Sequence, residues 1–321
     1  MPFSAKRSVA SRLAGHRRVG AASEYSPSRG RTHGHRCPND GQVEAVRTGL
    51  RELGYVDGRN IRIEYRGAQG QADRLPRLAE ELVRLKVDAL VVGAEPAVRA
   101  ARQATGTIPI VMVLYDYDPV VAELIDSFSR PGGNITGIFT RQSELVGKRL
   151  ELLKQALPGV SRVAVFWDSF GRRQLEELEP AARSLGIQLQ LVQLQVPYDF
   201  ETAFKTAKQK RADAVTLLFS PVFYTQRVQI GALALKYRLP MVISQPDYVE
   251  PGGLMSYGPR WADTWGRAAY FIDRLLKGAK PSDLPVERTA TFKLVVNLKT
   301  AKALGITIPE SLLPRADEVI R

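Results

Sequence analysis

The sequence predicts an α/β protein made of two similar doubly wound lobes, each a parallel sheet with helices on both faces. Two observations support this prediction. An Asp-Ala pair, a short apolar run and a loop with Pro occur at residues 88–96 and again at 213–221, and an aliphatic-Pro pair opens the next apolar run in each copy. From residue 41 onward, apolar runs alternate with helical segments of about 10–15 residues, a spacing typical of parallel sheets.

The elements of the first lobe follow from apolar spacing and turn residues. Apolar residues at helical spacing predict a helix over 43–53 that ends at Gly54, and alternation at 61–65 predicts a strand near a sheet edge. Asp73 is expected to cap the next helix, with Pro76 in its first turn. The remaining elements are expected at 87–93 (strand), 96–103 (helix), 108–114 (strand), 119–128 (helix) and 135–139 (a strand that crosses between the lobes).

The second lobe repeats the alternation. We expect helices at 143–157, 172–185, 199–209 and 261–276, with a short one ending at 304, and strands at 163–167, 187–192, 212–219, 239–243, 254–257 and 291–296. This lobe opens with a strand, whereas residues 26–40, where the counterpart would precede the first helix, contain no apolar run. Because a doubly wound sheet places that strand in its middle, the first lobe is expected to lack its first strand.

The expected domain boundaries follow from this pattern. Residues 1–41 are expected to be a disordered basic leader, residues 42–140 and 256–290 to form the first lobe, and residues 141–255 and 291–321 to form the second.

Composition argues against several classes of function. Cys37 is the single cysteine, and the three histidines, His16, His33 and His35, lie within the first 35 residues. The rest of the chain therefore lacks the residues of Ser-His-Asp and Cys-His catalysis and the usual zinc or iron ligands. It also lacks a Gly-x-Gly-x-x-Gly motif and a P-loop, so no catalytic residue, metal or cofactor is expected. No apolar run approaches the ~18 residues of a membrane helix.

The basic charge is concentrated at the start of the chain. The formal net charge is +13, of which residues 1–40 carry +6 and the rest +7, without a dense block. The leader has no apolar core of about 7–15 residues, as a secretory signal would, and no helix-turn-helix spacing. It is interpreted as a solvated tail, as a mistranslated or frame-shifted leader, or as a basic arm that contacts phosphates, and nucleic-acid binding is not expected.

Eight sequence motifs spread along the chain carry a family resemblance. They are residues 49–60 (GLRELGYVDGRN), 63–65 (IEY), 73–76 (DRLP), 130–137 (RPGGNITG), 148–153 (KRLELL), 252–258 (GGLMSYG), 297–302 (NLKTAK) and 315–318 (RADE). With these motifs, residues 42–321 resemble the solute-binding proteins of ABC importers, in the tryptophan/tyrosine-type group of type I periplasmic binding proteins. Members begin with an export signal and a first strand, and here the basic segment stands in their place.

The resemblance implies a function as well as a fold. It implies two lobes joined by three crossing strands, which close by a hinge motion over an amino acid or related small organic molecule. It further implies no enzymatic activity, a monomer, permease and ATPase partners in the membrane, and a periplasmic location. As translated, without a signal peptide, the chain is expected in the cytoplasm unless its start is misassigned.

Candidate ligand residues lie at the carboxyl ends of the expected strands, where open parallel sheets bind ligands. They are Ala94, Glu95, Pro96, Asp116, Asp118, Trp167, Asp168, Ser169, Phe219, Ser220, Pro221, Phe223, Gln245, Asp247 and Tyr257. The helix start after Gly93 suits a carboxylate, because its N–H groups and dipole favour an anion. One of Asp118, Asp168 or Asp247 suits an ammonium group.

Other interpretations of these residues stay open. Asp116 and Asp168 also suit helix caps, and Trp167 and Phe219 also suit core packing. Trp261 and Trp265, at helical spacing, are interpreted as a core stripe. Glu95 would repel a carboxylate, which favours cationic or neutral solutes as a hypothesis.

Three alternative functions have specific requirements, and an enzyme of doubly wound type, such as a sugar-nucleotide transferase, ranks last because the motifs and histidines it needs are missing after residue 40. A ligand-responsive transcription regulator of the same fold needs a DNA-binding head in residues 1–40. A truncated, non-functional member of the family is the other alternative, because of the leader.

Overall fold

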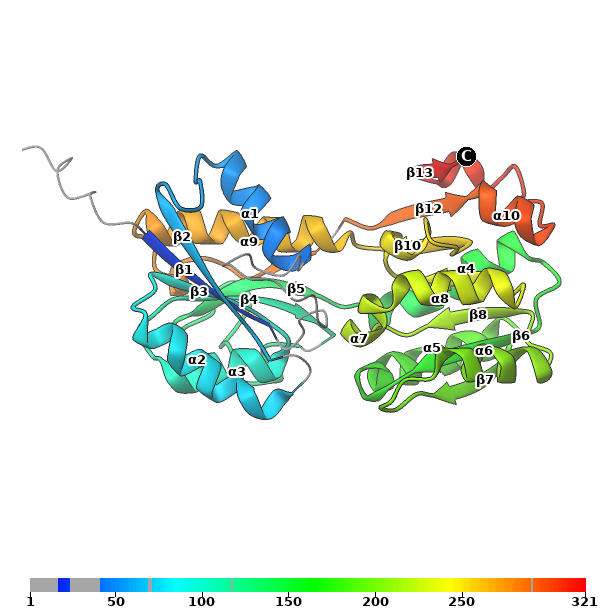
Figure 1. Ribbon diagram of the computed structural model, residues 1–321, viewed down its shortest axis with the longest axis horizontal. Coiled ribbons are helices and arrows are strands. Elements are labelled where there is room, and N and C mark those ends of the chain that lie inside the picture. Colours follow the sequence, from blue (N-terminus) through cyan, green and yellow to red (C-terminus); the bar gives the residue numbers. More distant parts are fainter. Residues whose placement is uncertain (1–16, 24–40, 69–70, 117, 290) are drawn as a thin grey trace, which may run out of the picture. The chain divides into compact units, whose positions relative to one another are not determined.

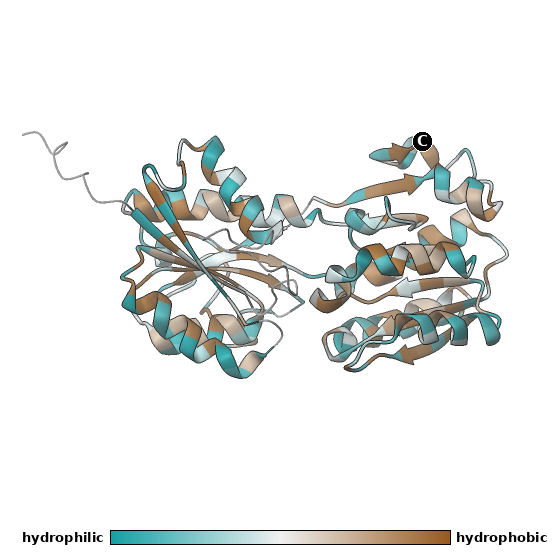
Figure 2. Cartoon of the chain, viewed as in Figure 1, coloured by the Kyte–Doolittle hydropathy of each residue, from teal (hydrophilic) through white to brown (hydrophobic). Residues whose placement is uncertain are grey.

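The computed structural model describes residues 17–23, 41–68, 71–116, 118–289 and 291–321. In it the chain forms an α/β fold with two sheets, each covered by helices on both faces (Figure 1). The chain divides into two compact units. Unit 1 comprises Met1–Val113, Glu123–Gly137 and Trp265–Val286, and unit 2 comprises Leu114–Ala122, Ile138–Thr264 and Glu287–Arg321. In the hydropathy colouring of Figure 2, apolar strands lie between helices with one polar side.

The first sheet has six strands. Their order across the sheet is β11 (Glu287–Arg288), β5 (Ile135–Thr140), β4 (Ile110–Tyr115), β3 (Ala89–Gly93), β1 (Arg17–Ser23) and β2 (Ile61–Gly67). Helices α2 (Leu75–Arg84) and α3 (Glu95–Ala104) cover one face, and α1 (Gly41–Glu52) and α9 (Trp261–Leu276) cover the other (Figure 1). The α1 and α9 backbones approach closely, since a Cβ at Gly49 would lie 2.5 Å from the Gly266 carbonyl oxygen.

Strand β1 overturns one sequence-based expectation. It lies in the interior of the sheet, parallel to β2 on one side and β3 on the other, so the expectation of a missing first strand is wrong. The expected disordered leader is likewise wrong for residues 17–23, and its remainder, 1–16 and 24–40, lies outside the described residues. The strand is poor in bulky apolar residues because space is short, and a Cβ at Gly20 would lie 2.8 Å from the Leu90 side chain. The sequence of β1 therefore lacks the apolar run by which the other strands were predicted.

The second sheet has seven strands. Their order is β13 (Glu318–Ile320), β12 (Lys293–Asn297), β10 (Met255–Gly258), β9 (Met241–Ile243), β8 (Ala214–Leu217), β6 (Arg162–Trp167) and β7 (Gln188–Gln193). The run β7-β6-β8-β9-β10 has the same order as β2-β1-β3-β4-β5, so the repeat in the sequence corresponds to a repeat in topology. Only β12 is antiparallel to its neighbour β10 among the strand pairs described for this sheet.

Alternate residues of β6 serve two hydrophobic cores. Val163 and Val165 pack with α4 (Val146–Ala156) and α5 (Arg172–Ser184), while Ala164 and Phe166 pack with α6 (Phe200–Gln209) and α8 (Arg227–Lys236). This alternation is the two-residue period of a strand buried on both faces. The remaining helices are α7 (Pro221–Thr225) and α10 (Leu298–Leu304), with short 3-10 turns η2 (Ala72–Arg74), η3 (Ser143–Leu145), η4 (Ser169–Gly171), η5 (Pro246–Tyr248), η6 (Pro281–Asp283) and η7 (Leu313–Arg315).

Two local expectations are wrong. Residues 119–128 form turns rather than a helix, since Glu123 has φ 56° and the Asp118 carboxylate binds the N–H groups of Val120 and Val121. Asp73 does not cap α2, whose start has no side-chain cap hydrogen bond, although Pro76 lies in its first turn as expected. The other expected helices and strands are present, with ends that shift by a few residues.

Candidate functional site

A buried carboxylate and two hydroxyl groups meet at the carboxyl ends of β6 and β8. Asp168 follows β6 and is 2 % exposed; its Oδ2 accepts hydrogen bonds from Ser220 Oγ at 2.6 Å and from the Tyr198 hydroxyl at 3.3 Å. Its Oδ1 accepts the Phe170 N–H and so caps η4, as the helix-cap interpretation expected. Burial raises the pKa of Asp168, and the Ser220 hydroxyl, which stabilises the ionised form, opposes that shift.

Three aromatic rings form a cluster in unit 2. The Tyr115 ring lies 5.1 Å from that of Phe219 and 5.8 Å from that of Trp261, and Phe219 and Trp261 are also 5.8 Å apart. The Tyr224 ring adds an edge contact to Trp261 at 4.2 Å. Trp261 is 6 % exposed, and its indole N–H has no hydrogen-bond acceptor among the described residues. A buried indole N–H usually has a partner, so this edge suits a polar group of a ligand.

Asp116 follows β4 in an uncommon backbone conformation. Its φ is 60°, which is unfavourable for a residue other than Gly, Asn or Asp. Its side chain is buried: Oδ1 accepts the Ser143 N–H at 2.7 Å, whereas Oδ2 has no partner among the described residues. Burial raises the pKa of Asp116 to about 6, against the lowering effect of the Ser143 N–H and of Arg149.

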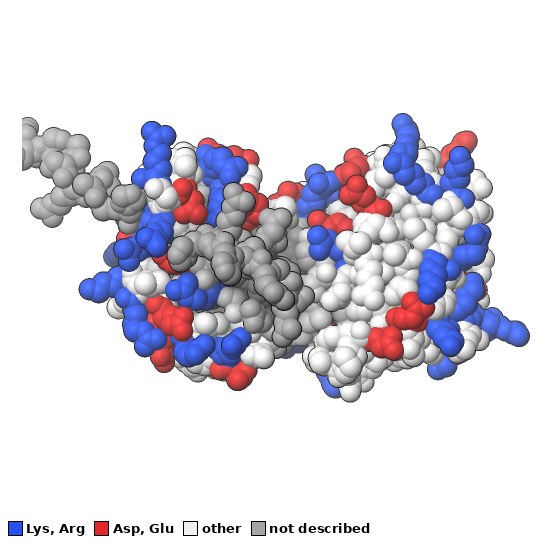
Figure 3. All heavy atoms as spheres, in the orientation of Figure 1, with Lys and Arg blue, Asp and Glu red and all other residues white. Residues whose placement is uncertain are grey.

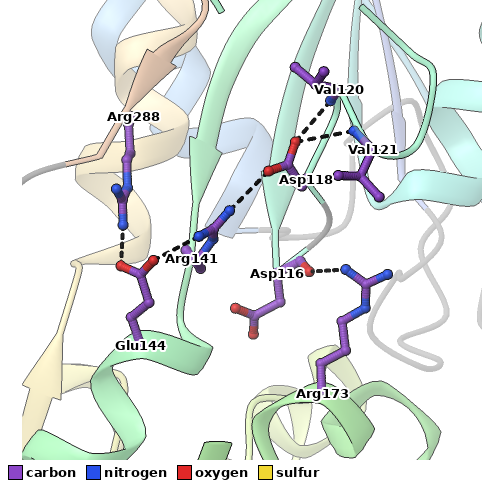
Figure 4. Close-up of polar contacts among 8 residues, drawn as sticks. All are labelled: Asp116, Asp118, Val120, Val121, Arg141, Glu144, Arg173 and Arg288. Carbon is purple, nitrogen blue, oxygen red and sulfur yellow. Dashed lines mark hydrogen bonds and ion pairs between the residues drawn. The ribbon is translucent and has the colours of Figure 1, made fainter.

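Asp118 starts a chain of ion pairs on the surface of unit 2. Arg141 binds both Asp118 and Glu144 at 2.9 Å, and Arg288 pairs with Glu144 from the other side (Figure 4). In the same figure Arg173 reaches the backbone oxygen of Asp116, at 3.4 Å, and not its carboxylate.

The three candidates of unit 1 lie at the start of α3. Ala94 precedes the helix with φ 70° and ψ 144°, a conformation that costs an L-residue energy and that often marks a functional loop. Pro96 lies in the first turn, and the start has no side-chain cap. Glu95 forms an ion pair with Arg99 one turn later, which reduces the repulsion that its carboxylate would exert on an anion.

The remaining candidates are of two kinds. Trp167, Gln245 and Tyr257 are buried or half-buried at strand ends, and the Trp167 indole N–H has no partner among the described residues. Ser169 and Asp247 are exposed. Pro221 begins α7, which the Ser220 hydroxyl caps by accepting the Val222 and Phe223 N–H groups. Phe223 is fully buried between the rings of Tyr198 and Phe200, which is a core position.

Three residues near these candidates were not expected at the site. Tyr198 and Trp261 contact candidate residues but were assigned to no site and to a core stripe, respectively. Arg149 is fully buried within α4, where its Nη1 donates to Gln142 Oε1 and to the Tyr257 carbonyl oxygen. An arginine in a Leu-rich helix gives no signal of burial, because most such arginines face water.

Surface charge and hydropathy add little to the site. On the face in Figure 3, the described Lys and Arg side chains are scattered among Asp and Glu over both units. Within the part of the chain that the structure describes, no helix is long and apolar enough to cross a membrane, and no group of His, Cys, Asp and Glu is arranged to hold a metal ion.

Comparisons with known proteins agree on one family. The family model for ABC transporter substrate binding proteins matches residues 38–320. A tyrosine-binding protein of Clostridioides difficile is 26% identical over 263 residues, which are 80% of this chain and 74% of the relative.

Two crystal structures resemble the chain at 27% identity, each covering 95% of this chain and all of the other. One is a conserved domain protein of Vibrio cholerae, with a TM-score of 0.81, and the other is an ABC domain of Streptococcus pneumoniae in complex with L-Trp, with a TM-score of 0.80.

Proposed function

We propose, because the chain belongs to the family of ABC transporter substrate binding proteins, that the small solute it captures is an aromatic amino acid. Family membership supports solute capture and not a transcription regulator. The relatives that bind tyrosine and L-Trp narrow the proposed solute class to aromatic amino acids.

The observation that carries the proposal is the ring cluster of Tyr115, Phe219 and Trp261. Apart from burial, each ring contact with an aromatic ligand adds about 0.5–1.5 kcal/mol, enough to favour Trp, Tyr or Phe over aliphatic amino acids. Polar groups for an amino acid's own charges lie close by in sequence: Asp116 follows Tyr115, and Ser220 follows Phe219. The indole N–H of Trp261 supplies one further donor.

The test is calorimetric titration with a panel of amino acids. We expect L-Trp, L-Tyr or L-Phe to bind at least about tenfold more tightly than L-Leu, L-Glu and L-Lys, a difference of ~1.4 kcal/mol. The panel also tests the Glu95 hypothesis, which favours cationic or neutral solutes. If L-Leu or L-Lys binds as tightly as the aromatic amino acids, the proposed solute class is wrong.

Two tryptophans of α9 form a matched pair of variants. Trp261 and Trp265 are four residues apart and similarly buried, but only Trp261 contacts Tyr115 and Phe219; Trp265 lies against Gly93. We expect Trp261→Phe to weaken binding of the aromatic solute several-fold and Trp265→Phe to leave it nearly unchanged. Equal effects of the two substitutions would remove the ring cluster from the site.

The other sequence-based candidates are part of this proposal. We infer that the carboxylate of the solute binds the start of α3 at Ala94, Glu95 and Pro96, and that its ammonium group binds one of Asp118, Asp168 or Asp247. Closure of two lobes over the solute stays a prediction, which small-angle scattering tests as a fall in the radius of gyration on addition of L-Trp.

Family membership also suggests the partners, oligomeric state and location of the chain, which we give as proposals. Substrate-binding proteins of this family generally act without catalysis and with an ABC permease and ATPase. We infer that this chain does so as a monomer outside the cytoplasm, and size-exclusion chromatography with light scattering, together with fractionation of the source cells, tests both points.

A further inference from the structure

Three buried polar side chains of unit 2 leave bonding capacity unused. Asp116 Oδ2, Gln142 Nε2 and Arg149 Nη2 are shielded from solvent and have no hydrogen-bond partner among the described residues. Gln142 connects the other two residues, since its backbone N–H donates to the Asp116 carboxylate and its side-chain Oε1 accepts from Arg149. The three residues therefore form one buried polar group.

Arg149 is the unusual member, because a buried cation is costly unless a carboxylate compensates it. Its two hydrogen bonds are long, 3.5 Å to Gln142 Oε1 and 3.4 Å to the Tyr257 carbonyl oxygen. No carboxylate among the described residues forms an ion pair with it. Burial lowers the pKa of Arg149 to about 10, so the guanidinium stays charged at neutral pH, and Asp116 is the carboxylate whose charge opposes this shift.

Asp116 in turn holds the end of β4. Its N–H donates to the carbonyl oxygen of Thr140, the last residue of β5, at 2.8 Å, and its carboxylate accepts the N–H of Ser143 in the segment that follows. These bonds maintain the φ of 60° at Asp116. Tyr115, the preceding residue, belongs to the ring cluster, so the position of its ring depends on the backbone at Asp116.

We propose that Arg149 is a positioning residue of the solute site, which acts through the ionised Asp116 carboxylate to hold the end of β4 and the Tyr115 ring. Its consequence for solute affinity depends on the proposed function, whereas the coupling of Arg149 to Asp116 does not.

The other charged groups near Asp116 are already engaged elsewhere. Arg173 of α5 donates to the backbone oxygen of Asp116, and Arg141 pairs with both Asp118 and Glu144 on the surface (Figure 4). Arg149 is thus the cation that favours the ionised carboxylate. Uptake of a proton by Asp116 leaves the Arg149 charge uncompensated and weakens the hold on β4.

The first arm of the test needs no solute. In protein labelled with ¹³C at aspartate carboxyl groups, Asp116 is assigned by loss of its signal in Asp116→Asn and then titrated by NMR. We expect a midpoint near 6 in the wild type. Arg149→Met should shift this midpoint to higher pH, and Arg149→Lys, which keeps the charge, should leave it close to the wild-type value.

The matched control is Lys148→Met. Lys148 precedes Arg149 on α4, is half-exposed and pairs with Glu151, so it removes the same charge without touching Asp116. The Asp116 midpoint should stay as in the wild type. An unchanged midpoint in folded Arg149→Met, or an equal shift in Lys148→Met, would overturn the proposal.

The second arm measures L-Trp affinity between about pH 5 and pH 8. We expect wild-type affinity to fall about tenfold from pH 7 to pH 5. In Arg149→Met the fall should start at higher pH, and in Asp116→Asn the affinity should no longer depend on pH over this range. If Arg149→Met does not fold, Asp116→Asn decides, because a pH dependence that persists there contradicts the proposal. If L-Trp does not bind but Arg149→Met still shifts the NMR midpoint, the proposed function fails and the coupling stands.

Discussion

Asp168 and Asp116 are both buried carboxylates after strands in the interior of a sheet, yet the protein stabilises them in different ways. Asp168 has two hydroxyl donors and one N–H donor shared between its two oxygens. Asp116 has backbone N–H donors on one oxygen, none on the other, and a buried arginine nearby. Hydrogen bonds satisfy both oxygens of the first carboxylate, whereas the second leaves one oxygen without a donor among the described residues and is stabilised in part by the charge of Arg149.

This difference predicts two kinds of response to change. Loss of Asp168 should mainly destabilise the fold, because buried hydrogen-bond donors would be left without an acceptor. Loss of the Asp116 charge should instead relieve a cost of burial while it disturbs the solute site, a trade-off common at functional positions.

The largest effect is expected for Asp168→Ala. It leaves the Ser220 hydroxyl and the Phe170 N–H without their acceptor, so the free energy of unfolding should fall by about 4 kcal/mol. Urea denaturation measures this loss. Asp247→Ala, at an exposed carboxylate, serves as the control and should change the stability by less than about 0.5 kcal/mol. A loss of below about 1 kcal/mol in Asp168→Ala would show that the local donors matter little.

The second effect is a pH dependence at Asp116. Its pKa is raised in the folded protein from 3.8 to about 6, so the folded state binds the proton more tightly than the unfolded state. The stabilisation is present below the unfolded value and is lost as pH rises through about 6. Relative to Asp116→Asn, the wild type should therefore lose up to about 3 kcal/mol between pH 4 and pH 7. Parallel urea-stability curves for the two proteins over this range would refute a perturbed carboxyl.

Ser220→Ala should give the third effect, about 2 kcal/mol of lost stability, because the hydroxyl donates to a buried carboxylate and also caps α7. The pKa of Asp168 should rise further, since the hydroxyl favours its ionised form. Tyr198→Phe removes the longer bond, at 3.3 Å, and should cost less. The reverse order of the two losses in thermal or urea unfolding would contradict this hydrogen-bond assignment.

The smallest effect is expected in the surface chain of ion pairs. Glu144→Ala removes the carboxylate between Arg141 and Arg288, but these groups are partly exposed and screened, so the stability should change by about 0.5 kcal/mol or less. That change should vanish in about 1 M salt. A loss comparable to that of Ser220→Ala, or one that persists in high salt, would contradict a weak and screened contribution of these ion pairs.

Sequence reasoning recovered the fold where elements carry strong apolar patterns. Strand β6, with the run Val-Ala-Val-Phe-Trp, was expected close to its observed place. Its topological counterpart β1 was missed, because small residues fill it where Leu90 and Leu82 leave no room for larger ones. The helix expected at 119–128 failed for a local reason, since Asp118 binds the N–H groups of the turn.

The site was predicted in outline and not in its contacts. Topology alone brought Asp168 and Ser220 together across 52 residues, because the carboxyl ends of neighbouring parallel strands meet at one edge. The part played by Arg149 could not be predicted, since burial of an arginine depends on the packing of α4 and not on its own sequence. Trp261 was interpreted as part of a core stripe, because its place in the ring cluster depends on its neighbours Tyr115 and Phe219, which are distant in sequence.

The interior position of β1 has a practical consequence for anyone who produces this protein. The family match starts at residue 38, so a gene trimmed to it, or translation from an internal start near there, would delete Arg17–Ser23. Strands β2 and β3 would then lose the neighbour between them, and each would expose a row of unpaired amide and carbonyl groups. Open edges of that kind promote aggregation, so we expect a gene that lacks this short, weakly apolar strand to give less soluble protein than the full chain.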